Sequence, residues 1–176
     1  MDHNKPLVNR VANSGLITIN LEEYFPQREM VSFDIKDHLF MEMILKEKDF
    51  RAALKEYPWE SLYQDKILLI HCSADAIIPL WAYMLITAYA QPYAHTIFQG
   101  DQDAFLISHY DKILDQFDAA THEGKRIVIK GCSDKPVPPA AYMKITALLR
   151  PYAQSIMFGE PCSTVPIFKR PRNLKK

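Results

Sequence analysis

The chain has 176 residues, a length that corresponds to about one domain. Its composition, 48% hydrophobic and 24% charged, is that of a globular protein and argues against intrinsic disorder. The 21 basic and 21 acidic residues cancel, which argues against a nucleic-acid-binding protein that relies on one broad positive face. The five glycines are too widely spaced for a dinucleotide-binding fingerprint or a phosphate-binding loop, so the sequence has no nucleotide-binding motif.

The start of the chain and the cysteines bear on its compartment. The first residues, MDHNKPLVNR, have no apolar stretch behind their charges, so we expect no secretory signal. The longest apolar run, Ala76 to Ala90, is shorter than the ~18–20 residues of a membrane span and contains a proline, so it predicts a buried helix. Three widely spaced cysteines fit a reduced protein. We therefore expect a cytoplasmic protein with no membrane partner and no nucleic-acid partner.

Self-comparison reveals an internal repeat between residues 66–101 and residues 126–160. The matched segments, first copy before second, are Cys72-Ser73 with Cys132-Ser133, Ala82-Tyr83-Met84 with Ala141-Tyr142-Met143, and Pro92-Tyr93-Ala94 with Pro151-Tyr152-Ala153. This many identities in register indicate a duplication.

Each copy has the pattern of a βαβ unit. An apolar strand, at residues 67–70 or 127–129, is typical of a sheet buried on both faces. A helix is predicted to begin near Pro79 or Pro139, because proline is tolerated at the first helical position. A short strand then closes the unit. The Ala-Tyr-Met segments on the two helices are predicted to lie in the core.

The N-terminal third has a different pattern. Apolar and polar residues alternate at 17–22 and 31–36, which predicts two half-buried strands in an antiparallel, hairpin-like pair. The expected fold is therefore a single α/β domain over residues 1–168. It combines duplicated βαβ units in a mostly parallel sheet with an N-terminal antiparallel strand pair. Residues 169–176, with five cations in eight residues, are predicted to be a basic flexible tail.

The cysteines are predicted to lie at the carboxyl edge of the parallel strands, where ligands bind. Cys72 and Cys132 end their strands and Cys162 follows the last one, so topology predicts all three at the edge where ligands bind. With His71, Asp75 or Asp134 as a fourth ligand, three thiolates would suit zinc or an iron–sulfur cluster. The sequence contains no CxxC pair, the usual sign of a metal site. Two other interpretations stay open: small buried hydrophobic residues, or a reactive thiol beside a helix N-terminus.

Other candidate residues are weaker. Asp34 and Asp37 resemble a carboxylate pair, but alternation along a strand places them on opposite faces, which argues against joint acid–base work. Trp81, Leu85 and Tyr89 form an apolar stripe on the first repeat helix, whereas the second copy has Lys144 where the first has Leu85. That stripe needs a cover, which either the N-terminal third or a second subunit in a homodimer would supply.

Six segments of the chain are similar to those of a known family: ANSGLITIN, FDIKD, ILKEKDF, CSADAIIPLWAYM, VIKGCSDKPVP and FGEPCSTVP. Together they resemble an uncharacterised bacterial family catalogued as domain of unknown function 2480, over residues 9–168. The resemblance implies no established activity, and it implies a genomic association with iron–sulfur cluster assembly. The leading hypothesis is therefore a metal-handling accessory or binding protein. An enzyme of thiol or small-anion chemistry at the same edge, and a structural or partner-binding module, are the alternatives.

Overall fold

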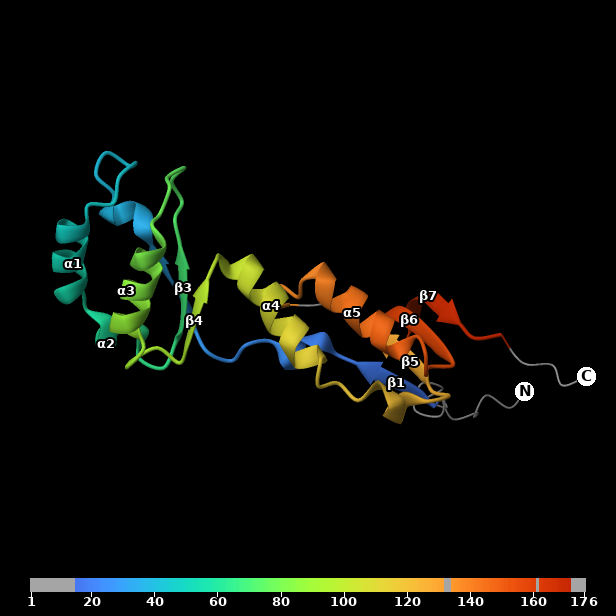
Figure 1. Cartoon of the computed structure of the whole chain (residues 1–176). Coiled ribbons are helices and arrows are strands. Elements are labelled where there is room, and N and C mark those ends of the chain that lie inside the picture. The colour runs from blue at the N-terminus through green and yellow to red at the C-terminus, as the bar shows by residue number, and fades with distance from the viewer. Residues whose placement is uncertain (1–14, 132–133, 161, 172–176) are drawn as a thin grey trace, which may run out of the picture. The chain divides into compact units, whose positions relative to one another are not determined.

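The computed structural model describes residues 15–131, 134–160 and 162–171 (Figure 1). The chain divides into two compact units: unit 1 comprises Met1–Phe25 and His109–Lys176, and unit 2 comprises Pro26–Ser108. Each has its own sheet and its own hydrophobic core. Helices alternate with mostly parallel strands in both, which confirms the predicted α/β class.

Unit 2 is built on a three-stranded parallel sheet in the order β2-β3-β4. Its strands are β2 (Met30–Asp34), β3 (Ile67–His71) and β4 (Thr96–Gln99). Its helical elements are η2 (Ile35–His38), α1 (Glu47–Lys55), α2 (Trp59–Tyr63), α3 (Leu80–Ala90) and the first part of α4 (Gln102–Leu114). The central strand β3 is buried along nearly its whole length, as the continuous apolar run predicted.

Aromatic side chains of α1 and α2 cover the apolar stripe of α3. The Trp81 ring meets the Phe50 ring edge-on at 6.1 Å, and the Tyr89 ring stacks on Trp59 at 6.2 Å. Leu85 packs against the same core. The stripe is therefore covered from within unit 2, which is one of the two alternatives expected from the sequence. Its burial does not require a homodimer through this face.

Unit 1 is built on a four-stranded sheet in the order β1-β5-β6-β7. The strands β1 (Leu16–Ile19), β5 (Arg126–Ile129) and β6 (Ser155–Glu160) run parallel, and β7 (Ser163–Lys169) runs antiparallel to β6. The helical elements are η1 (Leu21–Tyr24), the last part of α4, η3 (Ala119–His122) and α5 (Pro139–Leu149). Of the predicted basic tail, Lys169 ends β7, and residues 172–176 lie outside the described residues.

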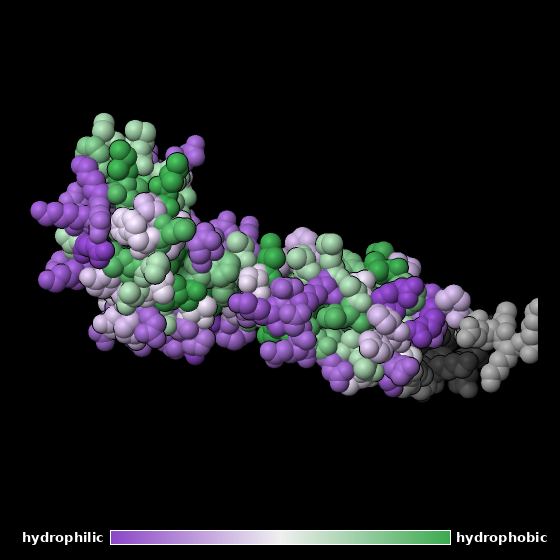
Figure 2. Space-filling model, in the orientation of Figure 1, coloured by the Kyte–Doolittle hydropathy of each residue, from purple (hydrophilic) through white to green (hydrophobic). Residues whose placement is uncertain are grey.

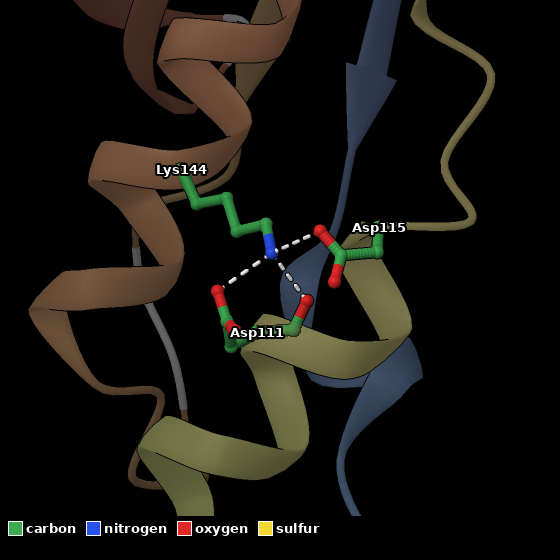
Figure 3. Close-up of polar contacts among 3 residues, drawn as sticks. All are labelled: Asp111, Asp115 and Lys144. Carbon is green, nitrogen blue, oxygen red and sulfur yellow. Dashed lines mark hydrogen bonds and ion pairs between the residues drawn. The ribbon is translucent and has the colours of Figure 1, made fainter.

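Two polar contacts join elements of unit 1. The Tyr110 hydroxyl of α4 donates a hydrogen bond to the Leu21 carbonyl of η1 at 2.9 Å. Asp111 of the same helix and Asp115, the first residue after it, face Lys144 of α5, whose Nζ lies 2.6 and 2.5 Å from their carboxylate oxygens (Figure 3). Lys144, which stands where the first copy of the repeat has Leu85, therefore links α5 to the C-terminal end of α4.

The repeat is confirmed, because β3-α3-β4 and β5-α5-β6 are both parallel βαβ units. The structure also extends it. Each copy pairs with a strand from the N-terminal third that continues into a short 3-10 helix, β2-η2 in unit 2 and β1-η1 in unit 1. The 3-10 helices are capped alike, by Asp34 in one unit and Asn20 in the other. The duplication therefore includes one strand and one 3-10 helix of the N-terminal third for each unit.

Two details of the predicted sheet are wrong. The N-terminal strands do not form an antiparallel pair, because β1 runs parallel to β5 and β2 runs parallel to β3. The repeats also lie in two sheets rather than one. Apolar and polar residues alternate in β1 and β2 because both are edge strands with one face better covered than the other. The same sequence pattern is typical of a strand in a hairpin, which is why the sequence predicted an antiparallel pair. The antiparallel pair of this fold is instead β6 with β7.

Only some residues of the two Ala-Tyr-Met segments are buried in the core. Ala82 and Ala141 are fully buried, as predicted, but Met84 and Met143 are 72% and 74% exposed. Within the described ranges, 15–131, 134–160 and 162–171, no helix combines the length and hydropathy needed to cross a membrane.

Candidate functional site

A cleft of about 630 Å³ lies where the parallel strands of unit 2 end. Ligands of parallel sheets bind at this carboxyl edge, because the loops that follow the strands meet there. The lining comes from the loop after β3, from α3 and from the loop after β4: His71, Cys72, Ser73, Ala74, Ala76, Ile78, Tyr83, Gln99, Gly100 and Asp101.

Cys72 and His71 bring a thiol and an imidazole to this cleft. His71 is the last residue of β3 and Cys72 is the first residue beyond it, and both are partly buried. Because the strand ends at His71, side-chain alternation does not force the two onto opposite faces, and both line the cleft. The Cys72 thiol donates a weak hydrogen bond to the Ala74 carbonyl, with 3.5 Å between sulfur and oxygen.

Tyr83 reaches the cleft from the first turns of α3. Its burial, and secondarily the nearby Cys72, raise the pKa of the phenol above its ordinary value. The hydroxyl is therefore protonated at neutral pH and can donate a hydrogen bond to a ligand in the cleft.

Asp34 supports the loop that carries the thiol. Its Oδ1 accepts hydrogen bonds from the backbone N–H groups of Lys36 and Ser73, each at 3.0 Å. Burial acts to raise the pKa of Asp34, but the hydrogen bonds from Ser73 and Lys36 and the neighbouring His71 outweigh it, so the pKa is lowered. Asp34 is thus a carboxylate at neutral pH, close to His71.

The far side of the cleft is set by the turn after β4. Gly100 has φ +139°, a conformation that favours glycine, and a Cβ there would lie 2.9 Å from the Phe98 ring. Its N–H donates to the Ile70 carbonyl at 2.8 Å, which keeps the turn against β3. Asp101 follows, and its Oδ1 accepts from the Ala104 N–H at 2.8 Å at the start of α4. The turn thereby adds a carboxylate to the lining.

The structure brings together two of the four predicted metal ligands. Cys72 and His71 share the cleft of unit 2, whereas Cys162 is an exposed free thiol between β6 and β7 of unit 1. Cys132 lies outside the described residues. Among the residues that are described, no three His, Cys, Asp or Glu side chains are arranged to hold a metal ion. Convergence of the three thiols stays a prediction.

Sequence reasoning missed the roles of Asp34 and Tyr83. Asp34 was weighed only as an acid–base partner of Asp37, and Tyr83 only as core. The available signal was position: Asp34 ends the strand that pairs with β3, so its side chain reaches the same edge as Cys72. A slightly larger cleft in unit 2, about 680 Å³, contains no thiol or imidazole; Tyr57, Trp59, Tyr89 and Tyr93 are among its lining residues.

One family model matches the chain over residues 5–170, and its description is "Protein of unknown function (DUF2480)". No curated protein matches the chain, and no solved structure does.

Proposed function

Because the chain belongs to the DUF2480 family, whose description assigns no function, we propose a function from the cleft itself. The protein binds a divalent metal ion, zinc or ferrous iron, as a metal-handling accessory protein. The observation that carries this proposal is that Cys72 and His71, a thiol and an imidazole, line one open cleft. Thiolate and imidazole are donor types that these ions accept from proteins.

An accessory role fits a site that is not a closed cage. Structural zinc sites surround the ion with four protein ligands, whereas an ion that must be passed on needs open positions for the next ligand. Cys72 and His71 line an open cleft, and Cys162 is an exposed thiol elsewhere on the chain. Cys162 and Cys132 are the candidates for receiving or releasing the ion, and supply of iron for cluster assembly is one use of such transfer.

The test is a competition titration of the reduced, full-length protein with zinc against a chromogenic chelator. Cys72→Ser and His71→Ala should each weaken the tightest site by about tenfold or more. Cys162→Ser is the matched control, because it removes the exposed thiol of unit 1 and should leave that site within about twofold. Equal zinc affinity in the wild type and Cys72→Ser would contradict the proposal.

One observation favours a second candidate, an enzyme of thiol or small-anion chemistry. Cys72 shares its cleft with the start of α3, whose N-cap Pro79 makes no side-chain capping bond. The positive end of a helix dipole favours negative charge on a nearby sulfur or ligand. Iodoacetamide should then modify Cys72 faster than Cys162, even though Cys162 is the more exposed of the two. The reverse order, read by peptide mass spectrometry, would exclude an activated thiol.

A further inference from the structure

Unit 2 carries a cluster of exposed apolar side chains beside the cleft, which we call the apolar patch. Its members follow either β2 or β3, and each is 48–94% exposed: Phe40, Met41, Met43, Ile44, Ile77, Leu80 and Met84. Because β2 and β3 are adjacent and parallel, both groups lie at the carboxyl edge of the sheet. Hydrophobic residues gather at this end of the unit in Figure 2.

The two halves of the patch are tied to one core. Leu45, next to Ile44, and Ile78, next to Ile77, both pack into the unit 2 core. Phe50 lies in the first turn of α1 and Trp81 in the first turn of α3, and the centroids of their rings are 6.1 Å apart. The exposed residues of both groups therefore flank buried neighbours of a single cluster, at one edge of the same sheet.

The turn at the tip of the patch is conformationally costly. Met41 and Glu42 have φ of 52° and 56°, in the left-handed region that favours glycine. The turn is closed by paired backbone hydrogen bonds between Phe40 and Ile44 at 2.8 and 3.1 Å. A rigid turn that holds Met41 and Met43 in solvent, at a cost in backbone strain, is a feature of recognition surfaces.

The exposed area is that of a protein interface. At ~200 Å² for a large side chain, the patch exposes on the order of 1,000 Å². The largest apolar patch of a typical monomer is ~300–600 Å², and each side of a standard interface buries ~800 Å². The patch has the size that one subunit contributes to a stable dimer.

We propose that the apolar patch is the interface of a homodimer, in which a second copy of this chain docks through the same patch. The rim supports a second copy, because its exposed charges are balanced: Lys46 and Lys48 alongside Glu42 and Glu47, which pair with Lys36 and Arg51 of the same chain. A two-fold interface places a rim against itself, so a balanced rim avoids the repulsion that charges of one sign would cause. A balanced rim gives no electrostatic attraction to an anionic membrane, which a basic rim would provide.

The proposed dimer also has a consequence for the cleft. Ile77 and Leu80 of the patch alternate along the chain with Ile78 and Tyr83 of the cleft lining, so the second copy sits at the mouth of the cleft. Alkylation of Cys72 by iodoacetamide should therefore slow as protein concentration rises through the dimer dissociation constant. This inference does not depend on the proposed metal site, because neither the patch nor the alkylation readout involves a metal.

Sedimentation equilibrium of the full-length chain tests the proposal from about 1 to about 200 μM. The wild type should approach twice the chain mass of 20.4 kDa, and Leu80→Glu or Ile77→Glu should raise the dissociation constant at least about tenfold. Melting temperatures measured at concentrations where the wild type is monomeric should be unchanged, because dimerisation itself stabilises the native state. Met143→Glu, at the equivalent position to Met84 in unit 1 and 74% exposed, should leave the dimer intact.

Three results would overturn the homodimer. The first is a wild type that stays monomeric across this range. The second is a dimer that survives Leu80→Glu and Ile77→Glu. The third is a monomer that sediments with neutral or anionic phosphatidylcholine/phosphatidylserine vesicles, and loses that binding in Leu80→Glu, which would assign the patch to a lipid surface instead.

Discussion

The carboxylate of Asp34 accepts a hydrogen bond from the backbone N–H of Ser73, with 3.0 Å between the two atoms. The same oxygen accepts from the N–H of Lys36. One side chain therefore caps η2 and also ties the end of β2 to the loop that follows Cys72. The geometry of the cleft depends on this bridge between two neighbouring strand ends.

The equivalent bridge in unit 1 is divided between two side chains. Asn20 caps η1 by accepting from the Glu22 N–H at 3.1 Å. Glu22 in turn accepts hydrogen bonds from the backbone N–H groups of Asp134 and Lys135 in the loop that follows β5. The duplicated units thus hold the loops that follow β3 and β5 with different residues.

Asp34→Ala is expected to lower the free energy of unfolding by about 1–2 kcal/mol, because two backbone donors lose their acceptor. Asp34→Asn should cost less, since an amide oxygen caps the same turn in unit 1 through Asn20. Urea denaturation of both variants measures the difference, with Asn20→Ala as the matched loss of a cap alone. If Asp34→Asn were as costly as Asp34→Ala, charge rather than hydrogen bonding would dominate the bridge.

The lowered pKa of Asp34 predicts a specific pH dependence. Because the folded-state pKa lies below the ordinary value of 3.8, the carboxylate stabilises the fold above that value. The stabilisation is lost as pH falls through the folded-state pKa. The stability advantage of the wild type over Asp34→Asn should therefore disappear on acidification, measured by thermal melting between about pH 2 and about pH 6. A difference that is constant over this range would contradict the assigned ionisation.

Tyr110→Phe tests the link between α4 and η1. The lost hydroxyl leaves the Leu21 carbonyl without its donor, so the free energy of unfolding should fall by about 1–3 kcal/mol. Burial, with smaller effects of Tyr142 and Glu22, raises the pKa of Tyr110 to about 12. The wild type should therefore lose stability as pH rises above 10, the ordinary value, toward 12, and Tyr110→Phe should lose less.

The control for this prediction is Tyr152→Phe, because Tyr152 is 37% exposed. Its unfolding free energy should change by less than about 0.5 kcal/mol. Equal alkaline losses in the wild type and Tyr110→Phe, followed by chemical denaturation at each pH, would show that another group controls the alkaline transition.

The sequence predicted those features that repeat or that have a fixed period. The Cys-Ser and Ala-Tyr-Met matches identified both βαβ units, and the apolar run of β3 predicted a strand buried along its length. Alternation at Ile17 and Ile19 showed that one face of a strand was covered, but not which strand lay beside it. The pairing of β1 with β5 depends on contacts more than 100 residues apart, which no local pattern contains.

The candidate site, like the fold, was predictable from the sequence only in part. The place of Cys72 and His71 at the carboxyl edge followed from topology, because parallel strands end together. The role of Asp34 did not, because it rests on a hydrogen bond to a residue 39 positions away. The exposure of Met84 was also missed, since helical periodicity places a residue on a stripe without showing whether another element covers it.

Leu85→Lys tests the cover that α1 and α2 provide for α3. Leu85 packs against the unit 2 core, so an ammonium group there should cost about 2–4 kcal/mol in unfolding free energy. Ala88→Lys on the exposed side of the same helix is the matched control and should change stability by less than about 0.5 kcal/mol. If chemical denaturation found the two variants equally stable, the aromatic cover of the stripe would have no energetic role.

Lys144→Met removes the charge that joins α5 to α4 and keeps the apolar stem of the side chain (Figure 3). Asp111 and Asp115 are one helical turn apart, so without the ammonium group they repel each other. The melting temperature should therefore fall at low salt, and most of the loss should vanish in about 1 M salt, where the Debye length is about 3 Å.

The pH dependence of the Lys144 contact has the opposite sign to that of Asp34. The hydrogen bonds to Asp111 and Asp115 raise the pKa of Lys144, so its contribution is complete below the ordinary value of 10.5 and is lost as pH rises through the folded-state pKa. Adding Asp115→Asn to Lys144→Met should restore part of the melting temperature, because it removes the repulsion that the first change exposed. A loss that is unaffected by salt and not restored by the second change would assign the contact to packing of the lysine stem rather than to charge.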